Sequence, residues 1–130
     1  MRQHLNFPDL VENGSAPFSN MVMDDDYVHL AGLVAADFPD GRPAVGDVAA
    51  ETTAVMDCIG RMLDKVGLGV SDIVRTDVHM VDLDAMSAMN AAYAAFFPNG
   101  DYPARTTTQS AALFGGCQVE ITCVARRRDG

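Results

Sequence analysis

Arg105 and Glu120 are the two residues of this sequence whose types and surroundings could do chemistry. Arg105 stands near the start of a run rich in β-branched residues, 103–109, and Glu120 lies inside a second such run, 118–125. A guanidinium binds a planar carboxylate through two parallel hydrogen bonds. A positioned carboxylate can orient or deprotonate a water molecule. The two residue types together could therefore bind a small carboxylic acid and activate water beside it.

Both runs are predicted to be β-strands that position these two side chains. Side chains alternate between the faces of a strand, so Arg105, Thr107 and Gln109 share one face of the first. The connecting segment 113–117 is short, which predicts an antiparallel hairpin or near-hairpin that could bring Arg105 close to Glu120. Two plainer alternatives remain: the residues pair with each other, or they lie separately on a solvated sheet face.

Length and composition indicate one domain, residues 1–130. A chain of 130 residues that is 48% hydrophobic can bury a packed core. The formal net charge of −9 repels a phosphate backbone, so the sequence argues against a nucleic-acid-binding protein. The only dense basic run, Arg126–Arg128, is typical of a solvated tail.

The cysteines Cys58, Cys117 and Cys123 are odd in number and show no C-x-x-C spacing, which favours free thiols and no metal site. The first residues lack the apolar segment of a signal peptide, and no apolar run is long enough to cross a bilayer. We therefore expect a soluble cytoplasmic protein with no membrane partner. The three histidines, at positions 4, 29 and 79, share no catalytic or metal-binding spacing, and ordinary structural roles are expected for each.

Hydrophobic periodicity predicts two helices among six strands. The expected strands cover residues 1–8, 18–23, 27–34, 73–81, 103–109 and 118–125, and the expected helices cover 48–66 and 84–97. Asp24–Asp26 is predicted to be the turn of a hairpin over residues 18–34. Gly32 inside a strand marks a bulge or a place where another group approaches the backbone closely.

The predicted strand 73–81 has two chemically different faces. Val74, Thr76, Val78 and Met80 should point one way, with Arg75, Asp77 and His79 opposite. The expected fold class is therefore α+β, with two layers: a mixed sheet of five to six strands and two helices on one face. The uncovered face also carries apolar residues, which predicts self-association around a rotation axis.

These elements and motifs resemble the YjgF/RidA family of reactive-intermediate deaminases. The most specific matches are Pro-Ala-Arg at residues 103–105 and Val-Glu-Ile at residues 119–121. Further matches, in the same order along the chain, are Leu-Ala-Gly at 30–32, Val-Gly-Leu at 66–68, Ser-Asp-Ile-Val at 71–74 and the helix segment 90–97. The resemblance covers the chain from about Phe18 to Ala125.

The resemblance implies a chorismate-mutase-like fold assembled as a homotrimer, with clefts between neighbouring subunits. In family members that deaminate, the counterpart of Arg105 binds the carboxylate of a 2-imino acid or its enamine tautomer, and the counterpart of Glu120 positions the attacking water. The resemblance also implies that four further residues shape the cleft: Phe18, Gly32, Asn90 and Thr107. Hydrolysis yields a 2-keto acid and ammonia, and no metal or organic cofactor is required.

Three residues depart from the family pattern. Phe18 stands where the well-studied deaminases have a tyrosine, Thr107 replaces a cysteine, and Ala31 replaces a common serine. Arg105 and Glu120 are kept, so the sequence predicts an enamine/imine deaminase like those that act on 2-iminobutanoate and 2-iminopropanoate, and the three departures leave its preferred substrate open. The alternative is a non-catalytic trimer that binds small carboxylates in the same clefts. A ribonuclease role is disfavoured by the negative charge.

Overall fold

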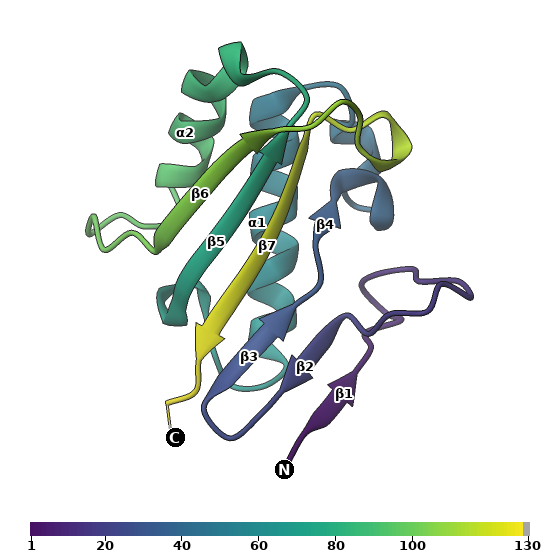
Figure 1. Ribbon diagram of the computed structural model, residues 1–130, viewed down its shortest axis with the longest axis vertical. Coiled ribbons are helices and arrows are strands. Elements are labelled where there is room, and N and C mark those ends of the chain that lie inside the picture. The colour runs from purple at the N-terminus through teal and green to yellow at the C-terminus, as the bar shows by residue number, and fades with distance from the viewer. Residues whose placement is uncertain (129–130) are drawn as a thin grey trace.

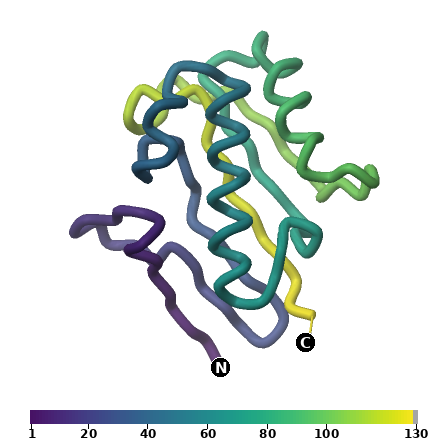
Figure 2. Tube along the Cα trace, turned by 180° about the vertical axis from the view of Figure 1, so that it is seen from behind, coloured from purple at the N-terminus to yellow at the C-terminus, as the bar shows by residue number. Residues whose placement is uncertain are grey.

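A computed structural model describes residues 1–128 as one mixed sheet with two helices packed on the same face (Figures 1 and 2). The strands are β1 (Gln3–Leu5), β2 (Met21–Met23), β3 (Tyr27–Leu30), β4 (Leu33–Val34), β5 (Ile73–Met80), β6 (Ala104–Gln109) and β7 (Val119–Arg126), and the helices are α1 (Val48–Asp64) and α2 (Met86–Ala94). The two-layer α+β prediction is confirmed. The sheet counts seven strands within the described residues because β4 forms a separate short strand after Gly32.

Strand β7 lies in the middle of the sheet. The order is β1-β2-β3-β7-β5-β6, with β4 also pairing with β7, and β5–β6 is the parallel pair. Helix α2 connects β5 to β6, and a crossover of this kind returns the chain parallel to the strand it left. The predicted hairpin of residues 103–109 with 118–125 is therefore wrong, because β5 lies between these two strands (Figure 1).

Helix α1 forms where its sequence predicts. The Asp47 carboxylate accepts a hydrogen bond from the Ala50 backbone N–H at 3.0 Å, which caps the first turn. Val55, Ile59 and Met62, spaced by three and four residues, are buried against the sheet. Gly67 follows the last turn at φ 78°, a conformation that glycine adopts without steric cost. The predicted apolar stripe and the start of the helix at Val48 are thus confirmed, whereas the helix ends at Asp64, two residues before the predicted end at residue 66.

The two faces of β5 differ from the prediction at one residue. Thr76, Val78 and Met80 are fully buried beneath the helices, as expected. Val74 instead has 41% of its surface exposed, because the pairing with β7 shifts register between Ile73 and Arg75. A bulge of this kind leaves one residue unpaired and turns its side chain away from the core.

The C-terminal arginines are anchored rather than forming the predicted solvated tail. Arg126 donates a hydrogen bond to the Tyr27 hydroxyl and belongs to β7. Arg128 binds both oxygens of the Asp72 carboxylate at 3.1 and 2.8 Å. Within residues 1–128, no helix is both long and apolar enough to span a membrane.

The hairpin predicted over residues 18–34 is confirmed as β2 and β3, with Asp24 at its turn. Asp24 accepts backbone hydrogen bonds from Tyr27 at 2.7 Å and Asp26 at 2.9 Å, and its second oxygen contacts His29. The hydrogen bond from Tyr27 is the largest cause that lowers the pKa of Asp24 to about 2. In the folded protein the Asp24 carboxylate therefore stays charged at pH values where the carboxylate of an unfolded aspartate is already protonated.

This lowered pKa predicts a specific acid sensitivity. The stabilisation is fully present above about pH 4, where an unfolded aspartate is also charged, and is lost as the pH falls through about 2. We expect the free energy of unfolding of Asp24→Asn to fall less steeply than that of the parent between these pH values. Urea unfolding at several pH values measures both slopes, and parallel slopes would contradict the role of Asp24.

Candidate functional site

Arg105 lies on β6 at the edge of the sheet and points toward the helices. Its register partner across the sheet is the buried Thr76, and its guanidinium carbon lies 5.1 Å from the centre of the Tyr93 ring. One guanidinium nitrogen contacts the sulfur of Met89 at 3.9 Å. No carboxylate pairs with Arg105 among the described residues. The side chain is thus a half-buried cation, held by an aromatic ring and available to an anion.

A cavity of about 320 Å³ opens beside this guanidinium. Two helix residues, Asn90 and Ala94, and two residues of the segment before β6, Tyr102 and Pro103, complete its lining with Tyr93 and Arg105. Asn90 and Arg105 therefore line the same cavity, and a role for Asn90 in substrate binding stays a prediction. Thr107 lies two residues further along β6, half-buried on the same face as Arg105.

Glu120 lies on β7 with Gly32 close against it. A Cβ atom added to Gly32 would lie 3.1 Å from the carboxyl carbon of Glu120 and 3.1 Å from the Thr122 hydroxyl. The predicted close approach at Gly32 is thereby confirmed, because a side chain there would crowd the carboxylate. Glu120 itself is half-buried and makes no hydrogen bond or ion pair within the described part of the chain.

The structure separates Arg105 and Glu120 onto opposite faces of the sheet. Arg105 pairs with Thr76 of β5, and Thr76 in turn pairs with Cys123 of β7; Thr76 and Cys123 are both buried on the helix face. Side chains alternate along β7, so Glu120, three residues before Cys123, points to the other face. The predicted proximity of Arg105 and Glu120 within one chain is wrong, and so is the plain alternative that they form an ion pair.

Phe18 does not line the cavity beside Arg105. It lies in the loop before β2 with 46% of its surface exposed. The loop is held at Asn20, whose backbone carbonyl accepts from the Ala31 N–H at 3.0 Å. Phe18 is thus connected through Asn20 to the segment that carries Gly32, while Asn90, Arg105 and Thr107 form a second group of predicted site residues.

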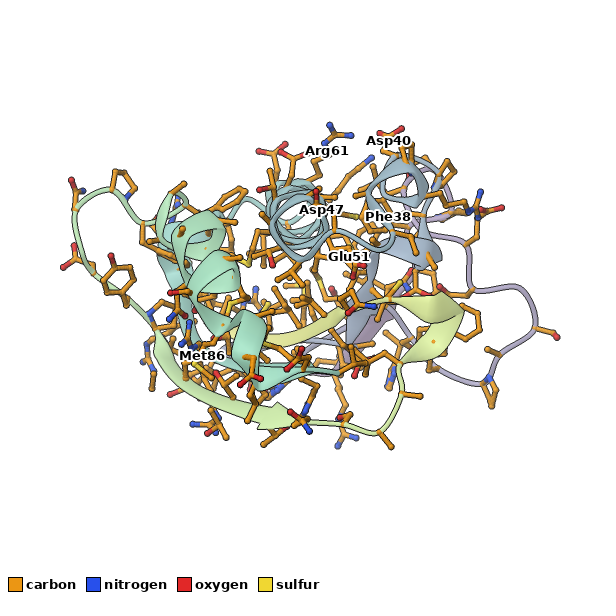
Figure 3. The ribbon with its side chains drawn as sticks, turned by 90° about the horizontal axis from the view of Figure 1, so that it is seen from above. Phe38, Asp40, Asp47, Glu51, Arg61 and Met86 are labelled. Carbon is orange, nitrogen blue, oxygen red and sulfur yellow. The ribbon has the colours of Figure 1, made fainter. Side chains whose placement is uncertain are left out.

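Glu51 is a functional candidate that reasoning from the sequence missed. It is fully buried on α1 and points into the space between the helix and the sheet (Figure 3). Its carboxylate accepts backbone hydrogen bonds from Gly46 at 2.8 Å, Gln118 at 2.8 and 3.0 Å, and Val119 at 3.1 Å. These contacts hold the start of β7, immediately before Glu120. The available signal was an acidic residue three positions after Val48, within the apolar stripe of α1.

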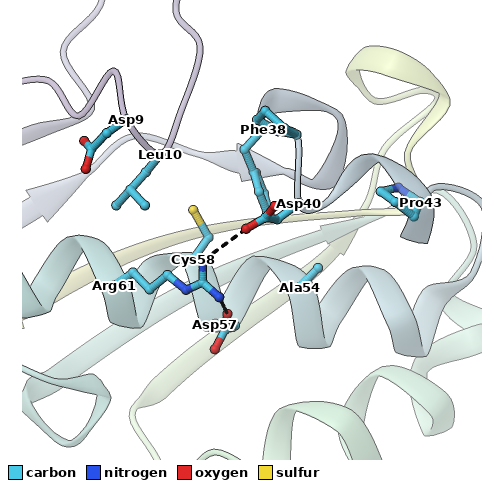
Figure 4. Close-up of a pocket in the computed structure, with 10 residues that line it drawn as sticks. Asp9, Leu10, Phe38, Asp40, Pro43, Ala54, Asp57, Cys58 and Arg61 are labelled. Atoms are coloured by element: carbon cyan, nitrogen blue, oxygen red, sulfur yellow. Dashed lines mark hydrogen bonds and ion pairs between the residues drawn. The ribbon is translucent and has the colours of Figure 1, made fainter.

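A separate cavity of about 480 Å³ lies along the outer side of α1 (Figure 4). At its rim Arg61 pairs with both Asp40 and Asp57 at 3.1 Å, so these charges satisfy one another. Burial raises the pKa of the Cys58 thiol in its lining to about 11, which leaves it protonated and a weak nucleophile at neutral pH. This cavity lacks the free cation that distinguishes the Arg105 cavity.

The three cysteines are buried free thiols, as predicted. Among residues 1–128, no three side chains of histidine, cysteine, aspartate or glutamate lie close enough together to hold a metal ion.

Comparison with known proteins identifies the family. The family model described as Endoribonuclease L-PSP matches residues 12–127. This chain belongs to that family. The resemblance to YjgF/RidA proteins is thereby confirmed. A human relative named 2-iminobutanoate/2-iminopropanoate deaminase is 30% identical over 109 residues, which cover 84% of this chain and 79% of the relative.

Solved structures of this L-PSP/RidA family share the fold. The YjgF gene product from E. coli superposes with a TM-score of 0.83 at 26% identity, over 97% of this chain and 99% of that one. YyfA from Yersinia pestis, a protein of the Rid family, gives a TM-score of 0.86 at 22% identity, over 98% and 100% of the two chains. This chain therefore has the α+β fold of L-PSP/YjgF proteins.

Proposed function

We propose that this RidA-family protein is an enamine/imine deaminase that hydrolyses 2-imino acids to 2-keto acids and ammonia. The observation that carries the proposal is Arg105, a half-buried guanidinium with no carboxylate partner in the described range, beside a cavity of about 320 Å³. In a protein of net charge −9, a cation left unpaired is suited to capture a small carboxylate. The deaminase name of the human relative supports the same reaction.

The proposed reaction requires the protein only to hold the substrate and to position and deprotonate a water molecule. The enamine tautomerises to the imine, water adds to the carbon of the C=N bond, and the carbinolamine expels ammonia to leave the 2-keto acid. Arg105 holds the substrate carboxylate while Glu120 takes a proton from the attacking water and returns it to the departing amine. No step needs a metal or an organic cofactor.

We further propose that the site is completed between subunits of a homotrimer. Arg105, Asn90 and Thr107 lie on the helix side of the edge strand β6, whereas Glu120 and Gly32 lie on the open face. The two groups can share one substrate only if a second copy of the chain supplies one of them. A ring in which each open face meets a neighbour's β6 edge would form such a cleft at every interface between subunits.

The cytoplasmic location of the protein stays a prediction.

The test is a trapping assay. An amino-acid oxidase generates 2-iminopropanoate and 2-iminobutanoate in the presence of semicarbazide, and semicarbazone formation is followed with and without the protein. Suppression of the semicarbazone signal by the parent is expected, because hydrolysis competes with trapping. No suppression by a folded protein would overturn the proposed activity on these imines.

Replacing Arg105 tests the carboxylate contact. We expect Arg105→Gln to raise KM roughly tenfold to a hundredfold, because it removes one partner of a charged hydrogen-bonded pair. Arg61→Gln, on the outer side of α1, is the matched control and should leave KM unchanged. An equal effect of both substitutions would contradict a specific role for Arg105.

A second candidate is a trimer that binds small carboxylates without turning them over. It is favoured by one observation: the free cation Arg105 is in place in a single chain, whereas Glu120 lies on the opposite face. Binding of pyruvate by calorimetry, together with no suppression in the trapping assay, would support this function. The charge of −9 argues against the endoribonuclease activity that the name of the family model suggests.

A further inference from the structure

The cavity beside Arg105 is larger than a three-carbon imino acid requires. Its volume of about 320 Å³ corresponds to about ten water molecules. The polar groups, Asn90 and Arg105, can bind a carboxylate. The remaining lining is apolar or aromatic: Ala94, Tyr102 and Pro103, with the largely buried Tyr93 behind them. This composition suits a ligand with a charged group at one end and an apolar body.

The aromatic side chains at this cavity are held by contacts with one another and with the core. The Tyr93 hydroxyl and the Thr76 hydroxyl are hydrogen-bonded at 2.8 Å in the core. The rings of Tyr93 and Phe97 are 5.2 Å apart, and Phe97 and Tyr102 meet edge-on at 6.0 Å. Tyr102 keeps 57% of its surface exposed, so part of its ring is free to contact a ligand. A further ring can therefore join this row with the geometry that aromatic pairs prefer.

We propose that this cavity receives the side chain of the imino acid, and that the preferred substrates are 2-imino acids with a large apolar, above all aromatic, side chain. The proposal rests on the deaminase function proposed above and adds the class of substrate. The carboxylate binds Arg105, and the aromatic ring packs against Tyr102. Ala94 leaves the space open because its side chain is a single methyl group.

The test compares 2-imino acids generated by an amino-acid oxidase from phenylalanine and from alanine, again trapped with semicarbazide. We expect kcat/KM to be at least about tenfold higher for the aromatic imine. Ala94→Leu fills the cavity and Tyr102→Ala removes the contact surface, and each should lower the ratio of aromatic to three-carbon kcat/KM about tenfold. Ala95→Leu, at the residue that directly follows α2 and outside the cavity, should leave this ratio unchanged.

The outcomes separate this inference from the proposed function. Turnover of the three-carbon imine with no preference for the aromatic one overturns the substrate class and leaves the deaminase proposal standing. If neither imine is turned over, the deaminase proposal fails, and calorimetry with phenylpyruvate and pyruvate still tests the cavity. Tighter binding of phenylpyruvate that is lost in Ala94→Leu supports the cavity as a side-chain site, and equal affinities overturn it.

Discussion

Glu120→Gln is expected to lower kcat by about 10²–10⁴-fold while pyruvate binding, measured by calorimetry, changes little. The amide keeps the size of the side chain but cannot accept a proton from water. Binding depends on the guanidinium of Arg105, which is on the other face of the sheet and is not altered. Asp77→Asn is the matched control, because Asp77 is a carboxylate of β5 whose side chain already pairs with Arg75.

The same variant tests whether the site is shared between subunits. Mixing the Arg105→Gln and Glu120→Gln variants after dissociation should restore about one quarter of the parental sites, because random pairing brings an intact arginine beside an intact glutamate at that frequency. No recovery would contradict a cleft formed between copies. If the parent shows no turnover and both substitutions weaken pyruvate binding equally, the binding protein becomes the better explanation.

Glu51→Gln is expected to lower the free energy of unfolding by about 3 kcal/mol, and therefore Tm by about 10 °C. Both oxygens of the fully buried carboxylate accept backbone N–H groups, from Gly46, Gln118 and Val119. Glutamine replaces one of these acceptors with an N–H₂ group, so at least one buried donor faces another donor. Thermal and urea unfolding measure the loss.

Glu12→Gln is the matched control for this substitution. Glu12 lies at the surface and forms an ion pair with Arg42, a type of contact whose loss costs less than about 1 kcal/mol. A similar small effect at Glu51 would mean that the backbone N–H groups of Gln118 and Val119 find other acceptors. That result would remove Glu51 as the residue that positions the start of β7.

Local patterns predicted the individual elements well. The spacing of Val55, Ile59 and Met62 identified α1 and its buried face, and Asp24 identified the turn of the first hairpin. Both depend on interactions within a few residues, which the sequence displays directly. The exposure of Val74 was not predicted, because the bulge that causes it arises from pairing with β7, which is far away in the sequence.

The types of side chain at the site were also readable from the sequence. Arg105, Glu120 and Gly32 stood out, and their motifs identified the family. What only the tertiary structure decided is where these residues lie relative to one another. The crossover through α2 places β5 between β6 and β7, and the register of these pairs aligns Arg105 with Thr76 and Cys123, so Glu120, three residues from Cys123, lies on the opposite face. Alternation along a strand assigns a residue to a face, but only the pairing of distant strands decides which faces meet.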